Sequence, residues 1–283
     1  MKALTVSIVI PVYNEAEQLG ACLEAIARQT VKPREVIVVD NNSTDDTAAV
    51  ARQYKFVTLL SETKQGVVYA RDRGFNAARG DIIGRLDADS LITENWVETL
   101  QRLFKDGRLD AVTGSVRYYG LAMSRLLDAL DLRVRRRMAR LLGREVALQG
   151  ANMAIRRRAW KAVSASLCRR GNMHEDYDLA IHLAAMGYTV SFEESLRTLI
   201  DCRRLESSWL EFCRYSWLSP HTYALHNLRS RRHMYPIVLL VIVCYWPLKL
   251  LYRGFDGDAE RFSWRKVLAA PAPARVNPAT FVE

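Results

Sequence analysis

Asp81-Ile82-Ile83-Gly84-Arg85-Leu86-Asp87-Ala88-Asp89-Ser90 is a short apolar run that leads into two carboxylates one residue apart. Alternate side chains of a strand lie on one face, so Asp87 and Asp89 can point the same way where a strand ends. Two neighbouring carboxylates repel each other unless a cation or a proton lies between them. Oxygen-rich sites of this kind suit Mg²⁺ or Mn²⁺, which commonly bridge carboxylates to a diphosphate. A polar turn after a strand is the alternative interpretation of this triplet.

The composition is that of a globular protein with an unusual charge. The chain has 283 residues, an ordinary apolar fraction and a net charge of +10, which allows one large domain or two small ones. The positive charge favours an anionic partner, such as a nucleotide, a phospholipid surface or a nucleic acid. Five scattered cysteines without a Cys-x-x-Cys pair argue against a zinc site or a disulfide framework. They predict reduced thiols in a cytosolic protein.

Strand-like and helix-like segments alternate around residues 81–90. Residues 6–12 are a continuous apolar run, typical of a strand buried on both faces. Met1, Lys2 and this run superficially resemble a signal peptide, but Pro11 and Asn14-Glu15 end it. Further strands are expected at residues 35–40, 56–60, 81–86, 111–116 and 188–192, and helices at residues 15–29, 66–78, 96–104, 157–164 and 174–187. The pattern predicts an α/β fold with a Rossmann-like, mostly parallel central sheet flanked by helices.

Polar residues follow three of these expected strands. They are Tyr13-Asn14-Glu15, Asp40-Asn41 and Asp87-Ala88-Asp89. Ligands of open α/β sheets bind at the carboxyl ends of the strands, so we expect these residues at one edge. A further acidic group, His174-Glu175-Asp176, opens an expected helix. The helix dipole favours carboxylates there, which is a sufficient structural explanation for Glu175 and Asp176.

Two later segments suggest a membrane surface. Residues 121–142 place leucines on one helix face and, on the other, Arg125, Arg133, Arg135, Arg136, Arg137 and Arg140. This is either a solvated basic helix on a core or a helix that lies on an anionic membrane. Residues 236–252 are strongly apolar but contain Pro247 and Lys249. These features favour an in-plane or re-entrant segment over a membrane span, with a buried helix as the alternative.

Five segments resemble, in order, the motifs of the family 2 glycosyltransferases. They are residues 7–15, 36–45 and 66–78, Asp87-Ala88-Asp89, and Glu175-Asp176, so the resemblance covers residues 5–200. It implies a GT-A fold and the inverting transfer of a sugar from a nucleoside diphosphate sugar, with Mg²⁺ or Mn²⁺ as cofactor. The donor would be a UDP- or GDP-sugar.

The resemblance also implies roles for individual residues. Those expected to line the nucleoside pocket are Pro11, Tyr13, Glu15 and Asp40, with Asn41 where many relatives have a second aspartate. Arg71 would lie near the nucleotide. Asp87, followed by Ala88, would reach the ribose or the metal, and Asp89 would hold the ion. Asp176 would take the proton from the acceptor, with Glu175 and His174 as secondary candidates.

The expected organisation follows from the same motifs. Residues 1–205 would form the GT-A catalytic domain, with a nucleotide-sugar half at 1–116 and an acceptor half at 117–205. A helical region at 206–268, including the apolar segment 236–252, and a disordered tail at 269–283 would follow. The processive Gln-x-x-Arg-Trp motif is missing from the expected place, where the chain has Arg214-Tyr215-Ser216-Trp217, so we expect transfer of a single sugar.

The expected location is the cytoplasmic face of the inner membrane. A lipid-linked acceptor would suit that place, in cell-envelope or lipid-linked glycan synthesis, and no nucleic acid partner is expected. Two alternatives remain: a catalytically silent nucleotide-sugar-binding protein, and a nucleic-acid-binding protein, for which the arginines lack interleaved aromatic residues.

Overall fold

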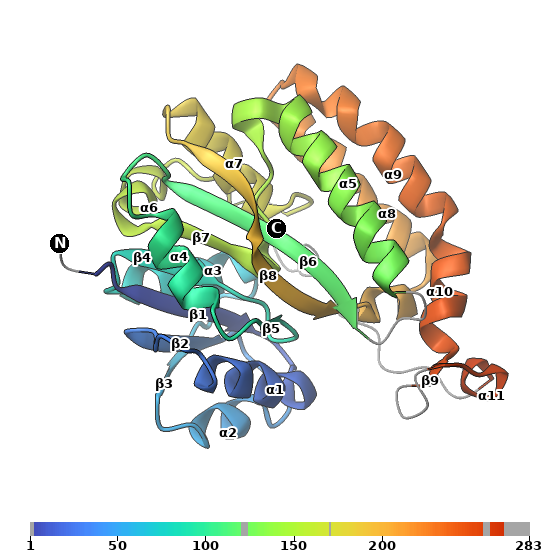
Figure 1. Ribbon diagram of the computed structural model, residues 1–283, viewed down its shortest axis with the longest axis horizontal. Helices are drawn as coiled ribbons and strands as arrows, with labels where there is room; N and C mark the ends of the chain where they lie inside the picture. Colours follow the sequence, from blue (N-terminus) through green and yellow to red (C-terminus); the bar gives the residue numbers. More distant parts are fainter. Residues whose placement is uncertain (1–2, 120–123, 170, 257–260, 269–283) are drawn as a thin grey trace.

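The central sheet has eight strands in the order β3-β2-β1-β4-β7-β6-β8-β5 (Figure 1). The computed structural model describes residues 3–119, 124–169, 171–256 and 261–268. The strands of this sheet are β1 Val6–Val12, β2 Glu35–Asp40, β3 Val57–Ser61, β4 Ile82–Arg85, β5 Leu91–Ile92, β6 Ala111–Tyr119, β7 Met153–Arg156 and β8 Val190–Asp201. A separate two-stranded sheet pairs β9 Phe255–Asp256 with β10 Arg261–Phe262.

The strand directions bring several carboxyl ends to one edge of the sheet. β3, β2, β1 and β4 are parallel neighbours. β7 is antiparallel to both β4 and β6, and β6 is parallel to β8. The carboxyl ends of β6 and β8 therefore reach the same edge as those of β1 and β4. The predicted α/β fold with a mostly parallel sheet is confirmed.

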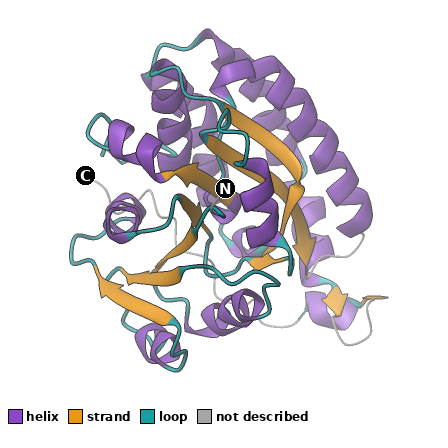
Figure 2. Cartoon of the chain, turned by 60° about the vertical axis from the view of Figure 1, so that its left-hand side comes forward, coloured by secondary structure: helices purple, strands orange, loops and turns teal. Residues whose placement is uncertain are grey.

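Helices cover both faces of the sheet (Figure 2). They are α1 Ala16–Ala27, α2 Thr47–Arg52, α3 Val67–Ala77, α4 Trp96–Leu103, α6 Arg157–Val163 and α7 Glu175–Ala185. Along β1, Ile8 and Ile10 belong to the core that includes α1 and α4, whereas Val9 belongs to the opposite core with α3, α6 and α7. Apolar side chains are buried on both faces, which is why β1 is a continuous apolar run.

Gly74 allows α3 to lie close to the sheet. A Cβ atom at this position would lie 2.3 Å from Cγ1 of Val9 and 3.0 Å from Cγ2 of Val39. Because protein interiors are close-packed, any larger residue would push the helix away from β1 and β2. The α3 helix is thus held at a distance that only glycine permits.

One strand prediction was wrong in extent, and two strands of the sheet, β5 and β7, were not predicted. The strand expected at 188–192 is the twelve-residue β8, which pairs with β6 along its length, with a register shift between Gly114 and Ser115. Glu193 and Glu194 interrupt its apolar pattern, so its length depends on pairing and not on local sequence. The sequence did not predict β5, because this two-residue strand exists through its antiparallel pairing with β8.

The remaining helices form a layer beyond β6 and β8. They are α5 Ser124–Leu142, α8 Trp209–Leu225, α9 Met234–Val243, α10 Tyr245–Arg253 and α11 Trp264–Val267. The α5 helix contacts β6 and β8, and α8 contacts both α7 and α9. The C-terminal helices are therefore packed against the sheet domain. The disordered tail predicted at 269–283 lies outside the described residues.

The basic helix differs from its prediction at one arginine. Arg135 does not lie on the solvated face: its Nε lies 2.5 Å from Oδ2 of Asp131, and its Nη1 donates to Oε1 of Gln149 at 2.7 Å. The exposed arginines of α5 are Arg125, Arg133, Arg136, Arg137 and Arg140. Arg135 is therefore held by contacts within the protein. Arg136 is paired with Glu194 as well, so the arginines most open to an external partner are Arg125, Arg133, Arg137 and Arg140.

The apolar segment 236–252 is divided between α9 and α10. Among the described residues no single helix is long and apolar enough to cross a membrane. Residues 229–243 and 245–253 pass that test only as a pair, with a bend of 49° between them. The bend lies next to Pro247, where a helix loses a backbone donor.

Candidate active site

A cavity of about 890 Å³ opens at the edge where the strands' carboxyl ends meet. It is lined by predicted site residues from four segments: Pro11, Tyr13, Glu15, Asn41, Asp87, Asp89, His174, Glu175 and Asp176. Asp40, Arg71 and Ala88 do not line it. The expected convergence of polar strand ends is thus present, and the structure adds the first turn of α7 to the same place.

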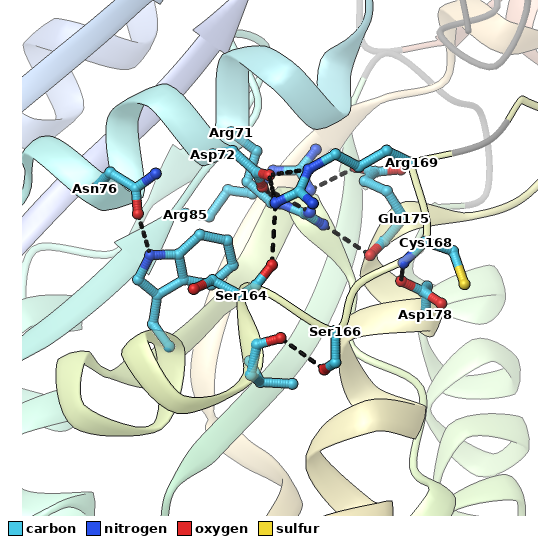
Figure 3. A network of polar contacts seen from close by, with 12 residues as sticks. Arg71, Asp72, Asn76, Arg85, Ser164, Ser166, Cys168, Arg169, Glu175 and Asp178 are labelled. Atoms are coloured by element: carbon cyan, nitrogen blue, oxygen red, sulfur yellow. Dashed lines mark hydrogen bonds and ion pairs between the residues drawn. The ribbon is translucent and has the colours of Figure 1, made fainter. Parts of the chain in front are cut away.

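Arg85 is the buried cation of this site (Figure 3). It ends β4, and its guanidinium lies 2.6 Å from Oε1 of Glu175 and 3.4 Å from Oδ1 of Asp87. Burial lowers the pKa of Arg85, but Glu175, Asp87 and Asp176 outweigh it and leave that pKa raised. Arg85 is therefore a permanent positive charge that links the strand-end carboxylates to those of α7.

The two adjacent carboxylates of α7 have opposite pKa shifts. Burial raises the pKa of Glu175, but Arg85 and Arg71 outweigh burial and lower it below the ordinary value. Burial and the neighbouring charge of Glu175 raise the pKa of Asp176 to about 7. Glu175 is therefore a fixed anion that neutralises Arg85, whereas Asp176 can take up and release a proton near neutral pH. This difference in pKa between Glu175 and Asp176 makes Asp176 suitable as a general base.

Backbone donors orient Asp176 without removing its basicity. Its Oδ2 accepts from the N–H of Gly150 at 2.8 Å, and its Oδ1 accepts from the N–H of Tyr177 at 2.9 Å. Hydrogen bonds to the ionised form lower a carboxylate pKa, yet burial and Glu175 dominate here. The carboxylate is consequently held in one direction at the wall of the cavity.

Asp89 lies beside Arg203, an arginine that was not among the predicted site residues. Arg203 Nη2 lies 2.6 Å from Oε2 of Glu15 and 3.8 Å from Oδ2 of Asp89, and its Nε lies 3.7 Å from Oδ2 of Asp201. Asp201 ends β8, so the strand-end rule applied to Asp87 would also have selected Asp201 and Arg203. Because the strand was expected to end at residue 192, both were missed.

The carboxylates at this edge fit a hard divalent cation. The side chain of Asp89 is 1% exposed and that of Asp87 is 19% exposed, and Asp201 is a third carboxylate nearby. The Cys22 thiol is fully buried, donates to the backbone carbonyl of Asp87 and does not line the cavity, so it presents no soft ligand there. A set of oxygen donors without soft ligands matches Mg²⁺ or Mn²⁺.

Two residues predicted at the nucleotide site, Asn41 and Arg71, make contacts that hold the surrounding structure. Asn41 holds residues 62–66: its amide donates to the carbonyls of Glu62 and Lys64, and its Oδ1 accepts from the N–H of Gly66 at 2.7 Å. Arg71 is fully buried; it pairs with Asp72 at 2.8 Å and donates to the carbonyl of Glu175. In this arrangement Arg71 supports the first turn of α7 from behind and makes no contact with the cavity.

His174 lies at the aromatic wall of the cavity. Its ring packs 4.8 Å from the ring of Tyr177 and 4.9 Å from that of Tyr215, between ring centroids. Burial, and the nearby charge of Arg204, lower the pKa of His174 to about 4 against the opposing effect of Glu175. The imidazole is therefore neutral at pH 7. Arg204 stacks 3.5 Å above the Tyr215 ring and lines the same cavity.

The cavity continues into an apolar channel between α5 and the α9–α10 pair. We call this part the apolar channel; its residues are Leu127, Leu130, Val134, Ile237, Leu240, Val241, Cys244 and Leu248. Leu130 is 46% exposed and Leu240 is 56% exposed. Apolar side chains left open to solvent in a cavity mark a place for an apolar ligand.

Residues 7–163 match the protein family described as Glycosyl transferase family 2. The chain belongs to this family. It is 33% identical over 119 residues to Glycosyltransferase GlyG of Streptococcus pneumoniae, a match that covers 40% of this chain and 39% of that protein. It is 37% identical over 120 residues to Glycosyltransferase AglE of Haloferax volcanii, covering 40% of each. The match thus spans about two fifths of the length of these relatives.

A solved structure of similar architecture is that of the mannosyltransferase PcManGT from Pyrobaculum calidifontis, determined in complex with GDP-Man and Mn²⁺. The two structures have a TM-score of 0.66 at 20% sequence identity, over 94% of this chain and 78% of that one. This likeness confirms the predicted GT-A fold of the family 2 glycosyltransferase. The family match ends at residue 163, so Asp176, Asp201 and Arg203 lie beyond it.

Replacing Gly150 with alanine should destabilise this member of the family. The added Cβ would lie 2.5 Å from Cζ of Arg85, whose guanidinium is held by Glu175 and Asp87. Overpacking of this kind costs about 1 to 3 kcal/mol, and we expect a matching loss in the free energy of unfolding, measured with denaturant. Gly20→Ala is the control, because its Cβ would meet its first neighbour at an ordinary 3.6 Å. Equal stability of the two variants would contradict the packing of Gly150 on Arg85.

Proposed function

We propose that this chain is an inverting, metal-dependent glycosyltransferase that moves one sugar from a nucleoside diphosphate sugar to an acceptor with a hydrophobic chain. One observation carries the proposal: a single cavity begins at Asp87, Asp89 and Asp176 and continues into the apolar channel. Family membership supports sugar transfer, and the continuity of the two regions supports the acceptor class. A lipid-linked acceptor, in cell-envelope or lipid-linked glycan synthesis, fits both.

The proposed chemistry divides the site between two carboxylate groups. Asp87 and Asp89 would hold Mg²⁺ or Mn²⁺, which when bound supplies positive charge to the leaving diphosphate. Asp176 would accept the proton from the acceptor hydroxyl or phosphate, and its raised pKa suits this work near neutral pH. Arg203 and Arg204 add positive charge to the same cavity, where phosphate groups of donor or acceptor would lie.

The donor is proposed to be a UDP- or GDP-sugar. Pro11, Tyr13 and Glu15 line the end of the cavity nearest β1 and would contact the nucleoside. Asn41 also lines the cavity, and its side-chain bonds to residues 62–66 would fix its orientation toward the nucleoside. The sequence beyond β8 has no processive motif, which supports transfer of a single sugar. A nucleotide-sugar-binding protein without activity is the second candidate, and the intact Asp176 counts against it.

A charge placed in the apolar channel should block transfer to a lipid acceptor. Labelled UDP- and GDP-sugars would be incubated with the full chain, Mn²⁺ and a polar lipid extract, and label would be counted in the organic phase. We expect Leu130→Glu to reduce that label at least about 10-fold, because burying a carboxylate against an apolar chain costs more than 1.4 kcal/mol. Donor binding should be unchanged.

Leu126→Glu is the matched control for this experiment. Leu126 lies one turn earlier on α5, is 50% exposed and does not line the cavity. Label that accumulates only in water-soluble products would overturn the acceptor class, and so would equal losses in the two variants. Sugar transfer itself would survive either result.

We further propose that the protein lies on the cytoplasmic face of the inner membrane. The exposed arginines of α5 and the exposed Val243 and Trp246 of the α9–α10 pair support this location. Basic residues near an anionic surface contribute about 1 kcal/mol each, and exposed apolar side chains add to this. The bend between α9 and α10 favours a segment lying in the interface over one that spans.

Val243→Glu combined with Trp246→Glu should release the protein from anionic vesicles in a flotation assay. These side chains are 72% and 63% exposed, so the change is expected to spare the core. Phe56→Glu, at an exposed site beside β3, should float like the wild type. A wild-type chain that stays at the bottom of the gradient at low salt would rule out the membrane location.

A further inference from the structure

A second group of metal-ligating side chains lies beside the active-site cavity, which one of them, Cys168, also lines. Cys168, Asp178, His182 and His226 place their ligand atoms within 4.8 Å of one another. We call these four residues the Cys168 cluster. None of them has a part in the proposed sugar transfer. They come from three segments: the loop between α6 and α7, the α7 helix itself, and the residue that follows α8.

Helix geometry and tertiary packing bring the four ligands together. Asp178 and His182 are four residues apart on α7 and therefore share one face of the helix. Nε2 of His182 lies 3.3 Å from Oδ1 of Asp178, and Nε2 of His226 lies 2.8 Å from the same oxygen. The sulfur of Cys168 lies 3.9 Å from Nε2 of His182. Each histidine thus turns the same ring nitrogen inward.

These distances are close to those of a tetrahedral zinc site. With zinc bonds of about 2.0 to 2.3 Å, neighbouring ligand atoms lie about 3.3 to 3.8 Å apart. The Cys168 cluster reaches this geometry if its side chains shift by about 1 Å or less at the widest pair. Thiolate, imidazole and carboxylate in one small group select Zn²⁺, whereas Mg²⁺ and Mn²⁺ prefer oxygen ligands alone.

Burial and charge also favour a cation in the Cys168 cluster. The side chain of Asp178 is 1% exposed, and those of His182 and His226 are 21% and 16% exposed. A thiolate, a carboxylate and two neutral imidazoles balance the charge of Zn²⁺, so the occupied site carries no net charge. The second oxygen of Asp178 accepts from the N–H of Cys168 at 3.0 Å (Figure 3). Such a contact orients a metal-binding carboxylate.

We propose that Cys168, Asp178, His182 and His226 bind a structural Zn²⁺ ion. The ion joins the α6–α7 loop and the end of α8 to α7, whose first turn carries Glu175 and Asp176. It is distinct in ligands and in place from the hard-cation site at Asp87 and Asp89. Four protein ligands fill the coordination sphere of this ion and leave no open position for a substrate. Its role is therefore structural.

Metal analysis of the full chain, purified without a histidine tag, tests the proposal. We expect roughly one zinc ion per chain. After removal of zinc and addition of Co²⁺, the wild type should show the near-ultraviolet thiolate-to-cobalt band and visible bands of tetrahedral cobalt. Cys168→Ser should lose the near-ultraviolet band, and His226→Ala should lose bound zinc. Zinc should raise the midpoint of thermal unfolding of the apo protein by about 4 °C or more.

Matched variants separate this cluster from other thiols and imidazoles. Cys213→Ser and His221→Ala change side chains of α8 outside the cluster and should keep both zinc and the cobalt spectrum. If Cys168→Ser does not fold, the wild-type cobalt spectrum decides alone. A folded wild type without zinc and without a thiolate-to-cobalt band would overturn the proposal. The four residues would then be a metal-free network in which Asp178 pairs with the two histidines.

Discussion

Replacing Asp176 with asparagine should lower kcat about 10²- to 10⁴-fold and leave donor affinity nearly unchanged. A general base acts in the chemical step, so its loss affects turnover more than ground-state binding. Asparagine keeps the size of the side chain and can keep one backbone contact with Gly150 or Tyr177, so the fold should survive. Turnover with Mn²⁺ and calorimetric titration of the donor measure the two quantities separately.

Two comparison variants make the Asp176 result specific. Glu17→Gln changes an exposed acid that also lines the cavity and should retain activity. Glu175→Gln should instead lower the midpoint of thermal unfolding, because the buried Arg85 would lose its nearest negative charge and keep only the longer ion pair with Asp87. An inactive Glu175→Gln beside an active Asp176→Asn would show that the base was assigned to the wrong carboxylate.

The pH dependence should report the same group. With a pKa of about 7 in the folded protein, Asp176 is protonated and inactive at low pH. We expect kcat/KM of the wild type to rise with pH through about 7. The pH profile of Asp176→Asn should lack this rise. The stability effect has the opposite sign, because a raised carboxyl pKa favours the folded state in its protonated form. That contribution is complete below the ordinary carboxyl pKa of about 4 and is lost as pH rises towards 7.

Asp89→Asn should weaken Mn²⁺-dependent donor binding by at least about 10- to 100-fold. Even residues that only orient a metal ligand contribute that much to affinity, and this site has few protein ligands. The loss should be confined to the metal-dependent part of binding. Calorimetry with UDP and GDP, in Mn²⁺ and in a chelator, measures it. Asp45→Asn, in the turn beside the cavity, controls for loss of charge; unchanged metal-dependent affinity in Asp89→Asn would refute the assignment.

The sequence contained enough to predict the parallel half of the fold and the location of the site. Strands β1, β2 and β4 are mainly apolar segments with polar residues after them, and local sequence determines both features. The convergence of Asp87 and Glu15 follows from strand direction, whereas the structure adds Asp176, which lies on α7. The sequence could not predict the contact between Arg85 and Glu175. It also could not predict that the pKa values of Glu175 and Asp176 shift in opposite directions. Both depend on burial and on a contact between two residues that are 90 positions apart in the sequence.

Other features needed the tertiary structure. β8 was expected to be short because its charged residues conceal its length, and Asp201 and Arg203 were missed with it. The zinc interpretation was rejected from sequence because no two cysteines are closely spaced. The Cys168 cluster instead uses one cysteine with ligands 10, 14 and 58 positions further along the chain. Packing of α8 on α7 brings His226 to the cluster. No local sequence pattern predicts that position of His226.

Release of nucleoside diphosphate from a panel of UDP- and GDP-sugars tests the central proposal most directly. The full chain would be assayed with Mn²⁺ and a lipid extract, in parallel with Asp176→Asn and with a chelator. Sugar transfer predicts that at least one donor is turned over by the wild type, and that the chelator and the substitution each suppress this turnover. Failure of the wild type to bind or turn over any donor would contradict the assignment, and so would turnover that Asp176→Asn retains in full.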